Sequence, residues 1–532
     1  MMDKITDIKN LYTIGKIDRR EFVQGAAALG LGAAAATTFI QESNAATPKN
    51  GGHVKAGSVG GQTADSMDVA TWVNSMQMVT GITINEYLTE TDADENLIPR
   101  FAEGWEPADG GKTWIFTLRK GAEHSNGKTI DAHDVVGSLS YHLGEDSKSS
   151  FKPQLAQIAS MKVEGDFTVI FKLNSANADF PVLTSDYRAA ILPCKDGKPL
   201  VVDGSISGGT CLLDSFEPGV RSIMKRNPNY WNSDVGHFDS IELLSLRDDN
   251  ARQTVLITGD VDVIQQCNLG TVDRLQALDN INVLSAEGKQ HFTFPMRTDA
   301  APFDNNDVRM AMKLSFEREE FLRKILRGYG SIGNDQPISR AYRYYDAKIP
   351  QRVYDPEKAK WHLKQAGMES LDVQLFASDT GFLGSPEAAA LYAERAKKSG
   401  INIDIVRAPA DGYWNDVWMK KPFCACQWFG RPVADEMLSL TYAAGGSWND
   451  TFWNHERFNK ILVEARSELD QAKRAEMYGE LQLIIRDEGG QLIPGFAHWV
   501  DAASTKISTP GKLSGRNSLD GFRFGERWWF NG

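Results

Sequence analysis

The stretch from Phe423 to Trp448 gathers aromatic, glycine and charged residues where a core strand would otherwise continue. Cys424–Phe429 predicts the end of a buried strand, because it is rich in aromatic residues and the Gly430–Pro432 turn stops it at once. Backbone N–H donors and helix N-termini converge beside such strand ends in α/β proteins. We therefore expect one wall of a ligand-binding site here, with the candidate contacts Trp428, Phe429, Gly430, Arg431, Asp435, Tyr442 and Trp448.

The segment that follows the turn, Asp435–Tyr442, predicts a short helix. Asp435 suits the N-cap, because its carboxylate can accept hydrogen bonds from the first free backbone amides. Met437, Leu438 and Leu440 would then face the protein interior.

A plainer interpretation of the same residues stays open. The chain has thirteen tryptophans, whose large flat rings suit either the enclosure of an organic ligand or a bulky core. Trp428 and Phe429 can equally be ordinary core residues, and Arg431 a solvated surface charge.

Length and charge limit the class of protein. A chain of 532 residues is too long for one compact core, so about two or three domains are expected. With 42% hydrophobic and 24% charged residues, the composition is typical of a soluble globular protein. The formal net charge of −12 argues against nucleic acid or an anionic membrane as the main partner, because phosphate groups select basic surfaces.

The N-terminus predicts export from the cytoplasm. Arg19 and Arg20 precede a weakly apolar run, Val23–Ile40, and Ser43–Ala45 offers a cleavage site of small residues. The pattern resembles a twin-arginine signal, and its apolar run is shorter than the roughly 20 residues that span a bilayer. We expect residues 1–45 to be a cleaved signal peptide and the mature protein to be periplasmic.

No motif for catalysis, a cofactor or a metal emerges from the sequence. Two Gly-Lys-Thr sequences suggest a phosphate-binding loop, but Glu106 and Ala122 stand where its first glycine is required. The nucleophile elbow, the zinc-protease helix and the dinucleotide fingerprint are also missing. The five cysteines are an odd number, so they cannot form a fully paired disulfide framework. We expect a protein that is not an enzyme and has no cofactor.

A family resemblance rests on several motifs in order. The run LIPRFAEGWEPADGGKTWIFTLRKGAEHSNGKTIDAHDVV, residues 97–136, resembles the solute-binding subunits of peptide- and nickel-type ABC importers. The Asn-Pro-Asn-Tyr-Trp sequence at 227–231 and the Gly-Asp-Val-Asp-Val sequence at 259–263 resemble later motifs of the same family. The likeness extends over residues 51–530, although no single motif decides it.

The resemblance implies an α/β bilobal periplasmic-binding-protein fold of the cluster C type, with an extra inserted subdomain and a hinged cleft. It also implies a monomeric receptor that closes over a small organic solute and delivers it to permease subunits with their ATPases. The expected divisions are lobe I at 46–90, 205–295 and 495–532, the inserted subdomain at 91–204, and lobe II at 296–494.

The candidate site departs from the pattern of peptide-binding members. In those relatives an aspartate follows the strand tryptophan by three residues and pairs with the α-ammonium of the peptide, whereas Arg431 stands there in this chain. The segment Asp379–Leu383, where dipeptide members carry an arginine for the ligand carboxylate, contains none. A peptide or peptide-like solute is expected. The alternatives are an anionic solute such as an opine or amino-acid conjugate, or a chemosensory receptor; Asp435 could supply a displaced acid.

Overall fold

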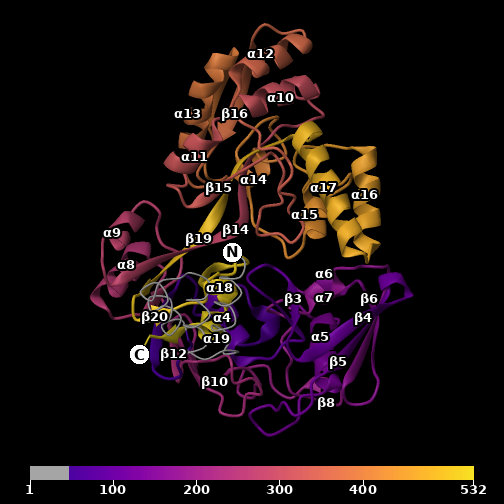
Figure 1. Cartoon of the computed structure of the whole chain (residues 1–532), viewed down its shortest axis with the longest axis vertical. Coiled ribbons are helices and arrows are strands. Elements are labelled where there is room, and N and C mark those ends of the chain that lie inside the picture. The colour runs from indigo at the N-terminus through magenta and orange to yellow at the C-terminus, as the bar shows by residue number, and fades with distance from the viewer. Residues whose placement is uncertain (1–46, 532) are drawn as a thin grey trace, which may run out of the picture.

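The chain folds into two lobes of mixed α/β structure, drawn below and above the centre of Figure 1. The computed structural model describes residues 47–531. The expected signal peptide, residues 1–45, therefore lies outside the described residues.

Two long antiparallel strands connect the lobes: β14 (Ile281–Pro295) and β19 (Gln491–Ser504). Their pairing is irregular between Glu287 and His291, which is where they pass from one lobe to the other. Phe292 and Phe294 already pack in the core of the upper lobe, so the expected lobe boundary at 295/296 falls inside that core.

The lower lobe contains most of a nine-stranded mixed sheet. Its central strand β1 (His53–Ser58) runs parallel to both neighbours, and its Val54 and Ala56 side chains are fully buried. The remaining strands of the sheet are β10 (Cys211–Glu217), β11 (Arg221–Arg226), β12 (Ser240–Ser245), β13 (Val263–Ile264), β15 (Gly330–Ile332) and β18 (Cys426–Trp428).

A separate antiparallel sheet lies beside it, in the order β4 (Ala102–Ala108), β5 (Thr113–Leu118), β7 (Thr168–Leu173) and β6 (Ile158–Val163). Alternation along β5 buries Trp114, Phe116 and Leu118 on one face. This sheet shares one continuous core with the lower lobe. It packs with α5 (Ala132–Leu143), α6 (Lys152–Leu155) and α7 (Phe180–Leu183).

Asp131 caps α5, because its side chain accepts hydrogen bonds from the amides of His133 and Asp134. Shorter elements complete the lower lobe: α4 (Ser75–Ile84), α8 (Asp249–Thr258), α9 (Val272–Gln276), α18 (Ser518–Phe522), α19 (Phe524–Arg527), β2 (Thr89–Thr91), β3 (Leu97–Pro99), β8 (Cys194–Lys195), β9 (Lys198–Pro199), β20 (Ile507–Ser508) and β21 (Trp529–Phe530).

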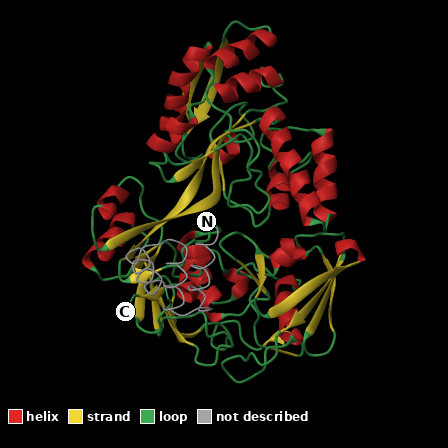
Figure 2. Cartoon of the chain, in the orientation of Figure 1, coloured by secondary structure: helices red, strands yellow, loops and turns green. Residues whose placement is uncertain are grey.

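Helices are the main regular elements of the upper lobe (Figure 2). Its far end holds the parallel pair β16 (Leu371–Ala377) and β17 (Ile401–Arg407) with α10 (Asn306–Leu314), α11 (Arg318–Lys324), α12 (Pro356–Gln365) and α13 (Ser385–Ala396). Helix α12 begins with Asp355 as N-cap and Pro356 in its first turn, where the missing N–H of proline breaks no helical hydrogen bond.

The part of the upper lobe that faces the lower lobe holds α14 (Tyr413–Asp416), α15 (Ala434–Thr441), α16 (Glu456–Ser467) and α17 (Gln471–Glu488). Strand β18 pairs with β14 and leads into α15. The side chains of β18, α15, α16 and α17 form their own core, whereas Tyr413 of α14 packs in a separate cluster with Val417 and Cys424. This arrangement brings the end of β18 to the boundary between the lobes.

Residues 47–531 include no helix that combines the length and the apolar character needed to cross a membrane. All five cysteines are buried and free. The same residues contain no group of three or more His, Cys, Asp or Glu side chains placed to hold a metal ion.

Candidate functional site

A cavity of about 1050 Å³ lies between the lobes. Its lower wall comes from α6, α7 and the segments that flank them, residues 153–188, and its upper wall from residues 430–448. Lys289 of β14 and the pair Arg516 and Asn517 close the side nearest the crossing strands. Both lobes therefore contribute side chains to one enclosed space.

The upper wall begins where β18 ends. Gly430 lies directly against Lys289: a Cβ atom at Gly430 would come within 2.3 Å of the Lys289 Cβ atom. A side chain at this position would push the turn away from β14, so the glycine holds the chain close to the crossing strand.

Arg431 lines the cavity without an acidic partner in the described part of the chain. Its backbone N–H donates to the Tyr342 hydroxyl at 2.9 Å, which fixes the backbone of the turn. Its Nη1 donates to the carbonyls of Phe429 and Gly430, both at 3.3 Å, and its guanidinium lies 5.8 Å from the ring centre of Trp448. The positive charge is therefore held in place but not neutralised.

Asp435 is not the N-cap of α15, contrary to the sequence prediction. The helix begins at Ala434, and its N-cap, Val433, makes no side-chain capping bond. The Asp435 carboxylate accepts a hydrogen bond from Arg466 Nε at 3.0 Å instead. Burial raises the pKa of Asp435, although the Arg466 guanidinium opposes this. A long-range arginine competes successfully with the local backbone amides for this acid.

The structure separates the seven candidate residues. Gly430, Arg431, Asp435 and Trp448 line the cavity. Trp428 and Tyr442 are 5% and 1% exposed and pack in the core behind the wall, and Phe429 is 57% exposed without lining the cavity. Alternation along β18 explains Trp428, because it shares the inner face of the strand with Cys426.

Leu440 also differs from its expected position. Met437 and Leu438 are buried as predicted, whereas Leu440 lines the cavity. Leu440 therefore adds an apolar surface to the upper wall.

Sequence patterns did not identify the lower wall. Asp186 and Arg188 form a bidentate ion pair, with Nε to Oδ1 at 2.8 Å and Nη2 to Oδ2 at 2.9 Å. Burial alone would raise the pKa of Asp186, but Arg188 lowers it below its usual range. The Arg188 guanidinium also lies 4.7 Å from the ring centre of Phe151. The two charges neutralise each other, and no sequence motif marked them.

Direct contacts join the lower and upper walls. Asp179, next to the start of α7, forms a bidentate pair with Arg474 of α17, with both N–O distances at 2.6 Å. The backbone N–H of Ala178 donates to the carbonyl of Arg466 at 2.8 Å. On the opposite side, Lys289 Nζ pairs with Glu95 at 2.7 Å. These contacts link the lobes at both sides of the cavity.

Glu436 is the second functional candidate that the sequence analysis missed. It lies in the first turn of α15 and lines the cavity, and no hydrogen bond or ion pair reaches its carboxylate from residues 47–531. Burial raises its pKa, and the positive charge of Arg431 opposes that effect. The nearest sequence signal was its position beside Asp435.

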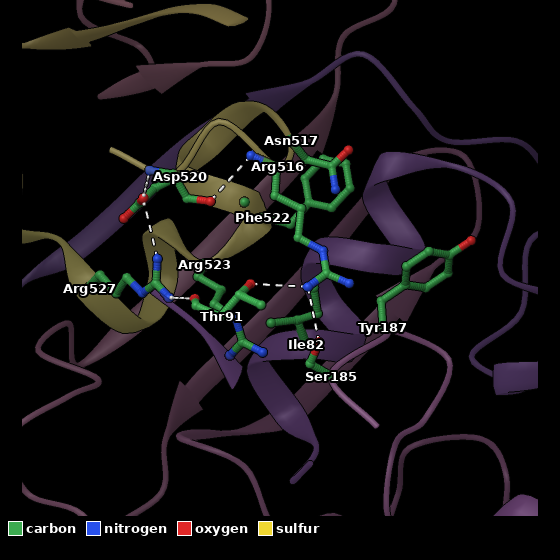
Figure 3. Close-up of a pocket in the computed structure, with 12 residues that line it drawn as sticks. Ile82, Thr91, Ser185, Tyr187, Arg516, Asn517, Asp520, Phe522, Arg523 and Arg527 are labelled. Carbon is green, nitrogen blue, oxygen red and sulfur yellow. Dashed lines mark hydrogen bonds and ion pairs between the residues drawn. The ribbon is translucent and has the colours of Figure 1, made fainter. Parts of the chain in front are cut away.

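Arg516 connects this cavity with a small adjoining pocket of about 20 Å³, shown in Figure 3. Its Nη1 donates to the hydroxyls of Thr91 and Ser185, both at 3.0 Å, and its side chain extends toward Tyr187. Neither partner is charged, although the guanidinium also helps to lower the pKa of Asp186. Arg516 therefore presents a second guanidinium without a direct ionic partner, this time from the lower lobe.

Together these groups can bind an ionised organic molecule. The cavity slightly exceeds the usual size of small-molecule sites, about 300–1000 Å³. Its walls combine fixed charges with the exposed ring face of Trp448 and the side chain of Leu440. Such a site can orient a ligand by its charged ends and hold its body against apolar surface.

Comparisons with known proteins identify the family of the chain and its fold. The model of the family described as bacterial extracellular solute-binding proteins, family 5 middle, matches residues 96–450. Di/tripeptide-binding protein 1 of Pseudomonas aeruginosa is 24% identical over 429 residues, which cover 74% of this chain and 79% of that protein. The dipeptide-binding protein of Escherichia coli is 25% identical over 442 residues, covering 75% and 80%.

A solved structure shares the fold at low sequence identity. HbpA2 of Haemophilus parasuis superposes with a TM-score of 0.79 at 19% identity, over 88% of this chain and 99% of that one. The expected bilobal α/β fold is confirmed.

Proposed function

Because the chain belongs to the bacterial extracellular solute-binding proteins of family 5, we propose that it captures a peptide or peptide-like solute between its lobes. It would then deliver this solute to the membrane permease of an ABC importer. The observation that carries the proposal is the cavity of about 1050 Å³, which both lobes line with fixed charges. Similarity to proteins named for dipeptide and di/tripeptide binding supports peptides as the ligand class.

Arg431 and Trp448 are the proposed ligand contacts on the upper wall. A guanidinium without an acidic partner can grip a ligand carboxylate with two parallel hydrogen bonds, and the Trp448 ring offers apolar contact area. Trp428 and Tyr442 would act indirectly, because they form the core that supports this wall. Gly430 would hold the turn against Lys289.

Closure of the lobes is the proposed mechanism. Only β14 and β19 cross between the lobes as long strands in the described chain, and their irregular pairing near Lys289 offers a place to bend. A ligand that contacts Arg431 above and Arg516 below stabilises the closed arrangement more than the open one. The permease, with its ATPases, would then recognise the closed, monomeric receptor.

Binding is tested directly with purified protein. Native mass spectrometry of protein prepared without refolding should show a retained small molecule. In a thermal-shift panel of dipeptides and tripeptides, a ligand at a hundredfold excess over its Kd should stabilise the protein by about 2.7 kcal/mol. Turnover of any bound peptide, or no binding across the panel, would contradict the proposal.

The role of Arg431 is tested by substitution. Arg431→Ala should weaken binding by about 2–5 kcal/mol, because a buried charge pair with the ligand is lost, and Arg431→Lys should also bind poorly. Arg457→Ala is the matched control, since Arg457 is an exposed arginine of α16 that does not line the cavity. Unchanged affinity in Arg431→Ala would leave Arg431 as a surface charge.

Export through the twin-arginine route is proposed from the sequence alone, because Arg19 and Arg20 lie outside the described residues. Changing both to lysine should leave the precursor in the cytoplasm, since the address depends on that pair. Fractionation of cells measures the result, and a normal periplasmic yield would contradict the proposal.

A further inference from the structure

The charged side chains of the cavity do not all balance one another. Eight charged residues line it: Asp179, Asp186, Arg188, Lys289, Arg431, Asp435, Glu436 and Arg516. Four are acids and four are bases, so the sequence alone would suggest a neutral site. The contacts of each side chain show that five are used within the protein and three are not.

The five used charges all have short ionic partners. Asp186 and Arg188 pair with each other. Asp179 pairs with Arg474, Asp435 with Arg466 and Lys289 with Glu95, at distances from 2.6 to 3.0 Å. A ligand that displaced any of these pairs would leave a buried charge uncompensated, which is costly.

The three remaining charges are two arginines and one glutamate. The Arg431 guanidinium donates only to the carbonyls of Phe429 and Gly430, and the Arg516 guanidinium only to the hydroxyls of Thr91 and Ser185. Glu436 has neither a hydrogen bond nor an ion pair from the residues that the structure describes, although the charges of Arg431 and Arg188 act on it at longer range. Counted by direct contacts, two positive groups and one negative group of the cavity are unpaired, and their sum is +1.

We propose that the ligand is an acidic peptide with a free N-terminus and a net charge of −1, whose ammonium meets Glu436 and whose two carboxylates meet Arg431 and Arg516. This inference rests on the proposed function. Burial of these three groups when the lobes close over a ligand costs least if the ligand brings an opposite charge to each, so the favoured ligand carries the complement of the three unpaired charges.

The placement of the three groups on two lobes supports this assignment. Arg431 and Glu436 are separated by one turn and the start of α15 on the upper wall, whereas Arg516 belongs to the lower lobe. A ligand with carboxylates at two separated points can therefore bridge the lobes, and its ammonium fits beside the upper carboxylate site. A neutral peptide with one carboxylate would leave one arginine unpaired in the closed cavity.

Glu436, and not Asp435, then takes the place of the acid that was expected for the ligand ammonium. Asp435 precedes it in the same helical turn and also lines the cavity, but Arg466 already neutralises it. The two neighbouring acids thus provide a matched pair, one free and one paired, for experiments.

The first test uses the unmodified protein and isothermal titration calorimetry at pH 7. The peptides are Glu-Ala-Ala and Ala-Ala-Glu, their amide counterparts Gln-Ala-Ala and Ala-Ala-Gln, Ala-Ala-Ala, Lys-Ala-Ala and N-acetyl-Glu-Ala-Ala. The tighter acidic peptide should bind at least tenfold more strongly than its amide counterpart and at least a hundredfold more strongly than Lys-Ala-Ala. N-acetylation should weaken binding at least tenfold, because it removes the ammonium.

The second test assigns the charges. In Glu436→Gln, the Kd of the N-acetylated peptide should be close to the Kd of the free peptide. In Arg516→Met, the Kd of the amide counterpart should be close to the Kd of the acidic peptide. Asp435→Asn is the control and should preserve both ratios. Because each ratio is measured within one variant, a loss of overall affinity or a lower Tm does not imitate the expected result.

The outcomes separate this inference from the function on which it rests. If Ala-Ala-Ala and the amides bind as tightly as the acidic peptides, the charge pattern is overturned while peptide binding stands. If no peptide of the panel binds, the proposed function falls as well. The assignment of Glu436 would be overturned if Asp435→Asn, and not Glu436→Gln, bound the free and the N-acetylated peptide with equal Kd.

Discussion

Two clusters of charged side chains in this protein lie close together but are built differently. The first, in the lower lobe, surrounds Arg100, which contacts Glu86 at 2.5 Å, Glu526 at 2.8 Å and Glu90 at 3.0 Å. Arg523 and Arg527 pair with the same acids, and Trp231 Nε1 donates to Glu86 at 2.7 Å. The second cluster is the cavity set, in which Arg431, Glu436 and Arg516 have no ionic partner among the described residues.

The difference indicates which charges serve the fold and which serve a ligand. Burial would raise the pKa of Glu90, but Arg523, Arg527 and Arg100 together hold it well below its usual range. Burial likewise raises the pKa of Glu436, and no directly bonded cation brings this pKa back to its ordinary value. A charge that is fully paired inside the protein has a sufficient structural role, whereas one left over in a cavity calls for a partner from outside.

The largest effect is expected for Arg100→Met. Removing this guanidinium leaves Glu86 and Glu526 buried without their main partner, so the free energy of unfolding should fall by about 3–5 kcal/mol. Urea denaturation at pH 7 measures it. Arg457→Met, which breaks an exposed pair with Glu480, is the control and should leave the free energy of unfolding nearly unchanged, because solvent screens an exposed ion pair. A similar small loss for Arg100→Met would remove the contrast between the clusters.

Asp450 is a buried acid whose hydrogen-bond donors are all neutral, unlike the acids around Arg100. Trp418 Nε1 and Gln491 Nε2 bond to it at 3.0 and 2.5 Å, and burial raises its pKa to about 7. The folded protein therefore holds a proton that the unfolded chain releases near pH 4, so stability is greatest at low pH and falls as pH rises toward 7.

Asp450→Asn should remove this pH dependence, and its NH2 group would face one of the two N–H donors, so the variant should be less stable than the parent at pH 5 and lose less stability between pH 5 and 8. Urea denaturation between pH 5 and 8 measures it. An equal decline in stability with pH in both proteins would show that Asp450 is already ionised in the fold.

Asp179→Asn weakens the contact between the lobes. The substitution removes the negative charge that faces Arg474. Because Arg474 keeps the Ala465 carbonyl and the Tyr344 hydroxyl as acceptors, the free energy of unfolding should fall by only about 2 kcal/mol. Small-angle X-ray scattering of the ligand-free protein should show a larger radius of gyration. Asp214→Asn, which breaks an exposed pair with Lys225, is the control and should leave the radius of gyration unchanged. An unchanged radius in Asp179→Asn would show that its pair with Arg474 does not hold the lobes together.

The smallest effect is expected for Glu436→Gln in the ligand-free protein. The raised pKa means that folding takes up a proton, so the stability due to this group is present at low pH and is lost as pH rises through the folded pKa. The glutamine variant should match the parent at low pH and exceed it at pH 8 by about 1 kcal/mol or less. A marked loss of stability at pH 8 would mean that Glu436 has a structural partner, like the acids around Arg100.

Local sequence patterns predicted the elements around the site well. Strand β18 ends at Trp428 before the glycine turn, and the short helix α15 follows that turn, because strand ends and helix starts depend on neighbouring residues. The same approach was wrong for Asp435. Its competing partner, Arg466, lies 31 residues further along the chain, which is beyond the reach of a local sequence pattern.

The sequence by itself determined the family, the bilobal class and the replacement of an expected acid by Arg431, since these depend on residue types in order along the chain. Only the tertiary structure decided which charges are free. Asp179 meets an arginine 295 residues away, and Arg516 reaches the cavity from the opposite end of the chain. Ionic pairing depends on distances of a few ångströms between such segments, so it became visible only once both lobes were in place.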